Sequence, residues 1–261
     1  MSVMGIALYS RDAATTAAFY ERHLGASQSA RADGSVRLRL DGGGLIELRP
    51  IGGVDADPAP CDDGRNGYWH AGVLVGDFDA TVKSLRGEGV EWFIEPVFNQ
   101  VAQVWCGFFH DPDGHVVELV GGQQQYSQVF DGEAAARRAR ARPGEAALFE
   151  HVAFTTPDWA RTRRTWTRAG YTVVGSLDLS DGDPRGMVLY YLTGADGLTV
   201  EVFTYTAPTA RALDPAPRQG FAGLLATAGT RARLEVDRIA DFAPNRGRYV
   251  DQAGLTVIDA E

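Results

Sequence analysis

The 261-residue chain has little cysteine, no excess of positive charge and no long apolar stretch, and each absence excludes a class of protein. Its two cysteines, Cys61 and Cys106, cannot build a disulfide framework or a zinc ribbon. With 25 basic and 34 acidic residues the formal net charge is −9, which disfavours a nucleic-acid partner. No apolar run approaches the roughly 20 residues that span a bilayer, and the first residues lack the features of a secretory signal. We therefore expect a cytoplasmic protein with no membrane partner.

An internal repeat is the most informative feature that the sequence does contain. The segment HAGVLVGDFDATVKSLRGEGV aligns with HVAFTTPDWARTRRTWTRAGY further along the chain. Three kinds of residue recur after 81 positions: His70 and His151, Asp77 and Asp158, and Gly89 and Gly170. A third copy near the N-terminus, GIALYSRDAATTAAFYERHLG, is followed by LIELR around Glu47. The repeat predicts a chain built from copies of one structural module.

Each copy is predicted to fold as one strand, one helix and then three strands. Short apolar runs such as GVLV and VAFT indicate the first strand. An aspartate then stands where the helix begins and a glycine where it ends, as at Asp77 and Gly89. The runs that follow are rich in residues typical of strands. We therefore expect an α+β fold of repeated βαβββ modules.

The segments between the copies suggest how the chain is divided. Residues 51–67 are rich in Gly, Pro and Asp and indicate a linker, whereas 121–148 carry EAAARRARAR, which indicates a solvated, charged helix. We interpret the tail as a degenerate fourth copy with a helix at FAGLLATAG and strands at ARLEVDRI, GRYVDQ and LTVIDAE. The predicted division is a first region, 1–120, with modules one (1–50) and two (68–120), a helical linker, 121–148, and a second region, 149–261, with modules three (149–206) and four (207–261).

Side-chain alternation along the strands separates core residues from candidate site residues. In module three, alternate apolar residues of the first and last strands share the face that packs against the helix. His151 and Glu201 therefore point to the opposite face. The equivalent residues are His70 and Glu118 in module two, and Gly5 and Glu47 in module one.

A glutamate between valines in an interior strand needs a counter-charge, because an isolated buried carboxylate is costly. A metal ion supplies that charge, and His and Glu side chains on rigid strands suit iron, zinc, manganese or nickel. A hydrogen-bonded His–Glu couple without a metal is the alternative, but its recurrence in two modules favours the metal. His110 and His115 flank the DPDG turn at 111–114 and are expected to be exposed turn residues.

The His-initiated strand–helix pairs and the segment FFHDPDGHVVEL resemble the vicinal oxygen chelate superfamily, which includes glyoxalase I, extradiol dioxygenases and bleomycin-resistance proteins. The resemblance covers roughly residues 3–206. It implies that paired modules curl their sheets into half-barrels that hold a divalent metal. Glyoxalase-like members use a His and a Glu from each paired module, whereas extradiol enzymes use two histidines and one glutamate. The resemblance also implies a homodimer.

Two pairings of the modules are open under this resemblance. If modules two and three face each other, the ligand set is complete: His70, Glu118, His151 and Glu201. If modules one and two pair in sequence order, Glu47 joins His70 and Glu118, and Gly5 occupies the fourth position. The completeness of the first set favours the pairing of two with three.

The resemblance implies a metal-dependent oxygenase that acts on a small bidentate aromatic or hydroxy-keto substrate. Fe(II) is the expected metal, with Zn, Ni or Mn as alternatives. The expected ligands are His70, His151 and Glu201, with Glu118 as a fourth ligand or a nearby catalytic base.

Tyr191 stands ten residues before Glu201, as in the extradiol motif, and is expected to hydrogen-bond a charged intermediate. The histidine which that motif places shortly before the tyrosine is missing here. A glyoxalase-like isomerase or lyase is therefore one alternative function. A metal-free protein that sequesters an antibiotic, as bleomycin-resistance relatives do, is the other.

Overall fold

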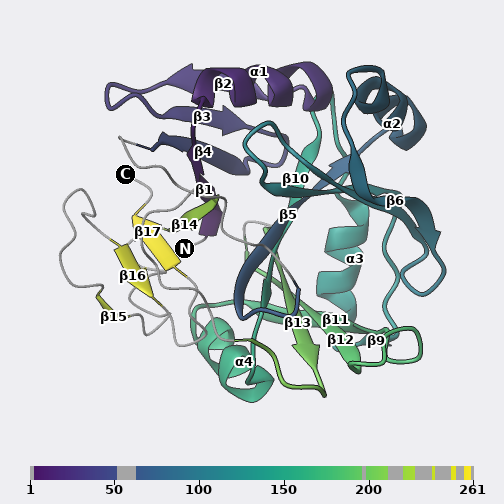
Figure 1. The fold of residues 1–261 in the computed structure, drawn as a ribbon. Coiled ribbons are helices and arrows are strands. Elements are labelled where there is room, and N and C mark those ends of the chain that lie inside the picture. The colour runs from purple at the N-terminus through teal and green to yellow at the C-terminus, as the bar shows by residue number, and fades with distance from the viewer. Residues whose placement is uncertain are drawn as a thin grey trace.

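The computed structural model describes residues 3–51, 63–195, 198–210, 220–226, 237–238, 248–250 and 256–259. Within these residues, two sheets are accompanied by four helices (Figure 1). The predicted α+β architecture is confirmed. None of the described helices is long and apolar enough to cross a membrane.

The first two modules have the predicted order of one strand, one helix and three strands. Module one comprises β1 (Val3–Ser10), α1 (Ala13–Leu24), β2 (Ser27–Ala30), β3 (Val36–Arg39) and β4 (Leu45–Pro50). Module two comprises β5 (Gly67–Val75), α2 (Phe78–Gly87), β6 (Trp92–Asn99), β7 (Val104–His110) and β8 (Val116–Gly121).

The connector and module three follow. The connector contains β9 (Gln128–Val129) and α3 (Gly132–Arg140). Module three comprises β10 (Leu148–Thr155), α4 (Trp159–Arg168), β11 (Thr172–Asp178), β12 (Met187–Thr193) and β13 (Thr199–Tyr205). The described strands of the tail are β14 (Gly220–Ala226), β15 (Asp237–Arg238), β16 (Arg248–Val250) and β17 (Thr256–Asp259).

The module helices begin where the aspartates predicted. The side chain of the N-cap aspartate accepts a hydrogen bond from a backbone N–H of the first turn in α1, α2 and α4, at Asp12, Asp77 and Asp158. Each cap satisfies an amide that has no partner within its helix. The glycines that follow these helices have positive φ angles, 67° at Gly25, 77° at Gly89 and 92° at Gly170. Local sequence therefore determines both ends of each repeated helix.

The strand order pairs the modules out of sequence order. The nine-stranded sheet runs β6-β7-β8-β5-β10-β13-β12-β11-β9, so modules two and three meet through the antiparallel pair β5–β10. The eight-stranded sheet runs β15-β16-β17-β14-β1-β4-β3-β2, so module one meets the strands of the tail. Modules one and two, although consecutive in the chain, lie in different sheets. The regions 1–120 and 149–261 thus each contribute strands to both sheets.

The segment FAGLLATAG does not contain the predicted helix. Its described part belongs to β14, which pairs with β1 and with β17. All residues from Ala222 to Ala226 are buried, so the run is apolar on both faces. A short run of this kind cannot be distinguished from a helix by periodicity, and pairing with β1 decides its structure. Strands β15, β16 and β17 fall in segments predicted to be strands.

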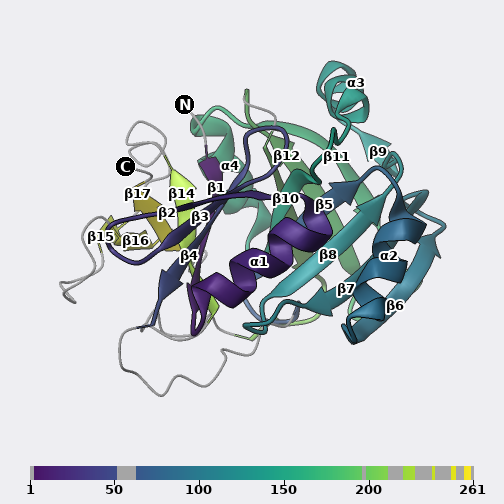
Figure 2. The same ribbon diagram turned by 90° about the horizontal axis from the view of Figure 1, so that it is seen from above.

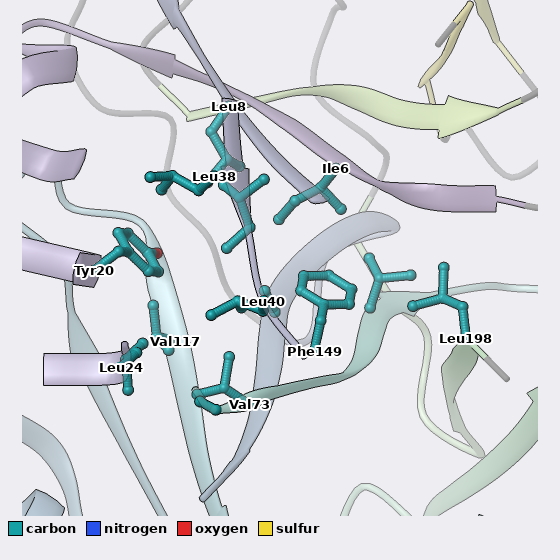
Figure 3. Packing of buried hydrophobic residues seen from close by; sticks show 14 of the residues in the cluster. Ile6, Leu8, Tyr20, Leu24, Leu38, Leu40, Val73, Val117, Phe149 and Leu198 are labelled. Carbon is teal, nitrogen blue, oxygen red and sulfur yellow. The ribbon is translucent and has the colours of Figure 1, made fainter. Parts of the chain in front are cut away.

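One apolar core joins the two sheets. Tyr20 and Leu24 of α1 lie close to Val117 of β8 and to Leu38 of β3 (Figure 3). Seen from above, α1 lies beside β8, at the junction of the two sheets (Figure 2). The helix-covered faces of modules one and two are therefore buried against each other, and the opposite faces are left to form sites.

The DPDG turn belongs to this junction, and the prediction that His115 is exposed is wrong. His115 is 2% exposed; its Nδ1 lies 2.8 Å from Asp111 Oδ2 and its Nε2 lies 2.8 Å from the carbonyl oxygen of Tyr9. Asp113 also accepts hydrogen bonds from module one, including that of Thr16 Oγ1 at 2.7 Å. The turn is buried because module one packs over it, which no local pattern reveals. His110 is exposed, as predicted.

Candidate metal centre

The four residues that alternation placed on one face come together in the nine-stranded sheet. One donor atom from each of His70, Glu118, His151 and Glu201 can be chosen so that all four atoms lie within 4.8 Å of one another. The Nε2 atoms of the two histidines are 2.9 Å apart. Glu118 Oε2 lies 3.3 Å from His70 Nε2 and 3.0 Å from His151 Nε2. The cluster joins two strands of each module.

Strand register explains why these four side chains converge. Glu118 is paired with Gly72, two residues after His70, and Glu201 is paired with Ala153, two residues after His151. Residues two apart on a strand share a face. In the antiparallel pair β5–β10, Ala153 lies opposite His70, and His151 lies opposite Gly72. The two His–Glu pairs are thus brought face to face by the junction of the modules.

Gly72 is required by the imidazole of His151. A Cβ atom at position 72 would lie 2.0 Å from Cε1 and 2.4 Å from Nδ1 of His151, far inside contact distance. The glycine lets the ring lie across β5 and reach the ligands of module two. This clearance depends on a residue from another module, so no local pattern indicates it.

A β-bulge adds a residue that the sequence analysis missed. The register of β10 shifts between Phe149 and His151, so Glu150 departs from simple alternation. One oxygen of Glu150 accepts a hydrogen bond from Nδ1 of His151, and the other accepts one from Arg138. Strand alternation predicts that the side chains of Glu150 and His151 point to opposite faces of the sheet. The bulge brings both of them to the same site.

Arg138 is the second missed residue. It lies on α3, which was interpreted as a solvated helix, yet its side chain is only 8% exposed. Its guanidinium donates to Glu150 and to the Tyr126 hydroxyl. The basic run EAAARRARAR offered no signal that one of its arginines is buried, because burial depends on where the helix docks.

Tyr191 lies in the site, but its hydroxyl already has a partner. The Tyr191 hydroxyl donates a hydrogen bond to Oε1 of Glu201. Burial and the neighbouring Glu201 carboxylate raise the pKa of the Tyr191 phenol well above its ordinary value. The phenol therefore stays protonated and fixes one oxygen of Glu201, which leaves Oε2 facing the histidines.

Two carboxylates of the site, Glu118 and Glu150, are held in the charged form. Burial would raise the pKa of Glu118, but hydrogen bonds and charge from His151 and His70 lower it to about 2. Burial acts in the same direction on Glu150, but Arg138 and His151 lower the pKa of that carboxyl to about 2. The site therefore presents anionic oxygens to any bound cation.

Three residues of the cluster, Glu118, His151 and Glu201, line a cavity of about 330 Å³. The other polar residues of its lining are Asp63, Asn99, Gln124, Glu150, Arg185 and Tyr191. Most of its other lining is apolar or aromatic: Trp69, Ile94, Val104, Cys106, Phe108, Val120, Leu177, Leu179, Met187, Leu189 and Phe203. A volume of this size accommodates a small organic molecule.

Arg185 is the cationic residue among the described residues that line the cavity, and ion pairs neutralise it. Arg185 donates to both carboxylate oxygens of Asp63, at 2.9 and 2.7 Å, and also to Asp183. Tyr205 donates to the same Asp63 at 2.7 Å. Cys106 is buried, which raises the pKa of its thiol to about 12, so it is not a nucleophile. The cavity is thus poor in free charge apart from the cluster.

The chemistry of the cluster fits a divalent metal. Oε2 of Glu201 is buried and accepts no hydrogen bond from any described residue, although it lies 3.3 Å from Nε2 of both His70 and His151. Metal–nitrogen and metal–oxygen bonds of about 2.0–2.2 Å place neighbouring ligand atoms about 3 Å apart around one ion. The separations of 2.9–3.3 Å match that spacing. A shared cation would satisfy the orphaned oxygen.

Glu47 is not part of this cluster. It lies in the eight-stranded sheet, where Arg37 and Arg49 donate to its two oxygens at 2.6 Å each. The alternative ligand set that combined Glu47 with His70 and Glu118 is therefore contradicted by the strand order, which separates modules one and two.

Comparisons with known proteins agree with this architecture. Residues 4–119 match the family model of the Glyoxalase/Bleomycin resistance protein/Dioxygenase superfamily. Glyoxalase I from Zea mays shares the fold with a TM-score of 0.66 and 16% identity, over 99% of this chain and 92% of that chain. A Bacillus subtilis protein provisionally assigned as a dioxygenase has a TM-score of 0.57 and 15% identity, over 98% and 84% of the two chains.

None of the curated proteins is similar enough in sequence to match. The two structural likenesses, at such low identity, concern the fold alone, and the sequence match covers residues 4–119. Together they confirm the predicted fold of repeated βαβββ modules. Residues 4–119 thus match this superfamily by sequence, and the chain shares the fold of glyoxalase I.

Proposed function

We propose that the protein is a mononuclear metalloenzyme, and specifically an Fe(II)-dependent oxygenase of a small aromatic substrate with two adjacent oxygens. The observation that carries this proposal is the position of the His–Glu cluster at the wall of a cavity lined by aromatic and aliphatic side chains. A pure binding protein gains nothing from four buried ionisable groups that share one centre, because their desolvation is costly.

His70, His151 and Glu201 are the proposed metal ligands. Each is at most 5% exposed in its side chain, whereas Glu118 is 13% exposed. Glu118 therefore serves as a fourth ligand or as the base that accepts a proton from the substrate. When bound, a divalent metal supplies Lewis acidity, and Fe(II) also supplies the redox chemistry that oxygen activation needs.

The residues around the cluster orient the substrate. The rings of Trp69 and Phe108 stack with their centroids 5.2 Å apart, and Phe203 meets Trp69 edge-on at 4.8 Å. Flat apolar walls of this kind favour an aromatic ring and exclude water. Since the cavity's arginine is already paired, the substrate is expected to carry no extra anionic group.

An isomerase is the second candidate, and the number of donors favours it. Two histidines and two glutamates, one pair from each module, form the set that glyoxalase-like relatives use. If all four are ligands, a bidentate substrate fills the coordination sphere, and the reaction is limited to proton transfer between adjacent carbons. Zn or Ni then replaces Fe(II).

Metal content and oxygen uptake separate these functions. Protein purified without chelator is analysed for Fe, Zn, Ni and Mn, loaded anaerobically with Fe(II), and mixed with a panel of catechols and 2-hydroxyketones in an oxygen electrode. We expect close to one metal per chain and oxygen uptake with a catechol. The control is His151→Ala, which should lose both.

Other results assign a different function. Metal binding without oxygen uptake, together with Ni- or Zn-dependent exchange of a substrate proton for deuterium, replaces the oxygenase by the isomerase. Less than about a tenth of an equivalent of any metal, even after loading, leaves a metal-free binder of hydrophobic molecules.

We further propose that the protein is cytoplasmic and forms a homodimer. Size-exclusion chromatography with light scattering tests the oligomeric state.

A further inference from the structure

The two pairs of candidate ligands differ in how they are supported. In module three, Nδ1 of His151 donates to Glu150, and Oε1 of Glu201 accepts from Tyr191. In module two, Nδ1 of His70 is buried and has no hydrogen-bond partner among the described residues. Among the described residues, both ligands of module three are therefore supported from outside the cluster, whereas His70 of module two is not.

Both supports lead to one guanidinium. Arg138 donates to Glu150, and its central carbon lies 4.8 Å from the centroid of the Tyr191 ring. A guanidinium over an aromatic face is attracted by the ring, and more strongly when it is desolvated. Arg138 thus contacts the partner of His151 and the partner of Glu201 at once.

The connector helix places this guanidinium by means of a second contact. Arg138 also donates to the hydroxyl of Tyr126, whose ring lies 5.4 Å from that of Tyr191. Tyr126 packs against Gly175 of β11, where a Cβ atom would lie 2.7 Å from its ring. The Arg138–Glu150 pair is therefore built between α3, β10 and β11, and is not a chance surface pair.

We propose that Arg138 and Glu150 are positioning residues that fix the orientation of two metal ligands, His151 and Glu201. This inference rests on the proposed metal function. Glu150 holds the proton of His151 on Nδ1, which leaves Nε2 free to bind a metal. Arg138 fixes Glu150 and the ring of Tyr191, so docking of α3 organises half of the site.

The chemistry of the pair explains why both members are needed. Arg138 and Glu150 have opposite charges and are both nearly buried, so together they add no net charge to the site. Removing either one leaves the other as an uncompensated buried charge, which is strongly unfavourable. Residues that hydrogen-bond a metal-binding histidine raise metal affinity by about 10–100-fold, because they fix the ring and its tautomer.

Metal affinity of matched variants tests the proposal. Glu150→Gln breaks one link in either orientation, because an amide cannot accept hydrogen bonds from both His151 and Arg138. The Co(II) dissociation constants of Glu150→Gln and Arg138→Met are measured by chelator competition. We expect both to rise about 10–100-fold, with a changed Co(II) absorption spectrum. Tyr126→Phe, which removes one hydroxyl, should act in the same direction if Arg138→Met fails to fold.

The same helix provides the controls. Arg137 and Glu133 form an ion pair on its exposed side, with side chains 51% and 85% exposed. Arg137→Met and Glu133→Gln should bind Co(II) as wild type does. If Glu150→Gln and Arg138→Met stay within about twofold of these controls, the positioning role is refuted while the metal function stands.

A measurement without metal distinguishes failure of the positioning role from failure of the proposed metal function. In wild-type protein without metal, proton NMR should show a downfield, slowly exchanging imidazole N–H signal that His151→Ala removes. Glu150→Gln and Arg138→Met should shift or broaden that signal, and Arg137→Met should not. An unchanged signal overturns the positioning role whether or not the protein binds metal. If the two variants change this signal but the wild-type protein binds no metal, the hydrogen-bond network exists and the proposed metal function is wrong.

Discussion

The two sheets carry a glutamate at the same register position but surround it differently. Glu201 pairs with Ala153 in the nine-stranded sheet, and Glu47 pairs with Ala7 in the eight-stranded sheet. Two residues before the paired alanine stands His151 in the first case and Gly5 in the second. Glu201 faces imidazoles, whereas Glu47 is bound by two arginines.

The partners of the glutamate decide what each sheet can do. Burial would raise the pKa of Glu47, but Arg37 and Arg49 hold it below its usual value. Fixed cations already neutralise that carboxylate, so no positive charge remains to be supplied. An imidazole is not a fixed cation: in its neutral form it donates a lone pair, so the carboxylates of the other sheet could share a metal ion with the two histidines. The same module thus carries a structural ion pair in one sheet and a candidate metal site in the other.

Among these changes, removal of a histidine of the nine-stranded sheet should have the largest effect, which is on metal affinity. His151→Ala is expected to lose more affinity for Co(II) or Zn(II) than the roughly 10–100-fold that loss of a supporting residue costs, because it removes a ligand. Glu47→Gln should bind metal as wild type does. Metal analysis after dialysis measures both. If His151→Ala kept its metal and Glu47→Gln lost it, the metal would bind in the eight-stranded sheet, and the proposed site would be wrong.

Restoring the missing histidine should not restore a site. Gly5 has φ 154°, and a Cβ there would lie 1.8 Å from the carbonyl oxygen of Leu45. Gly5→His is therefore expected to destabilise the fold, by about 1–3 kcal/mol from backbone strain alone, without adding metal. Urea unfolding measures the loss, and Gly43→Ala, where no atom lies near, is the control for steric contact. A second bound metal in Gly5→His would contradict the steric argument.

A single methyl group should weaken the metal site. Gly72→Ala copies the residue found at the equivalent positions, Ala7 and Ala153, but its Cβ would lie 2.0 Å from His151 Cε1. The ring must move, so we expect metal affinity to fall by about 10–100-fold with the fold preserved. The matched control is Ala153→Gly, which adds no atom. Equal affinities in wild type and Gly72→Ala would show that the ring of His151 lies elsewhere.

The junction between modules one and two should show the smallest, pH-dependent effect. Burial favours neutral His115, but Asp111 and the Tyr9 carbonyl raise its pKa above the ordinary value. The protonated ring therefore stabilises the fold fully below the unfolded pKa of about 6.5, and this contribution disappears as the pH rises through the folded pKa.

His115→Gln tests this sign. The difference in free energy of unfolding between wild type and His115→Gln should be largest near about pH 6 and shrink towards about pH 9, as measured by urea unfolding. His110→Gln, on the exposed side of the same turn, should give no such trend. A difference that grows with pH would mean that His115 is neutral in the folded protein.

Much of the candidate site followed from local sequence. The repeat spacing and strand alternation were enough to place His70, Glu118, His151 and Glu201 on one face of each module. The aspartate caps and terminal glycines were enough to place the helices. These features depend on contacts within a few residues or on the pleat of a strand, so a local pattern contains them.

The remaining features depend on how distant segments pack. The pairing of β5 with β10 brought the four candidate ligands together, the docking of α3 buried Arg138, and the packing of module one over the turn buried His115. None of these contacts has a periodic signature, because each joins residues from different modules.

The sequence by itself determined the module and the residues on its two faces, since steric and hydrogen-bonding rules act along the chain. Tertiary structure decided which modules share a site, since that choice depends on which apolar faces bury each other. It also decided that Glu150 lies beside His151, because a bulge in β10 overrides alternation at that one position.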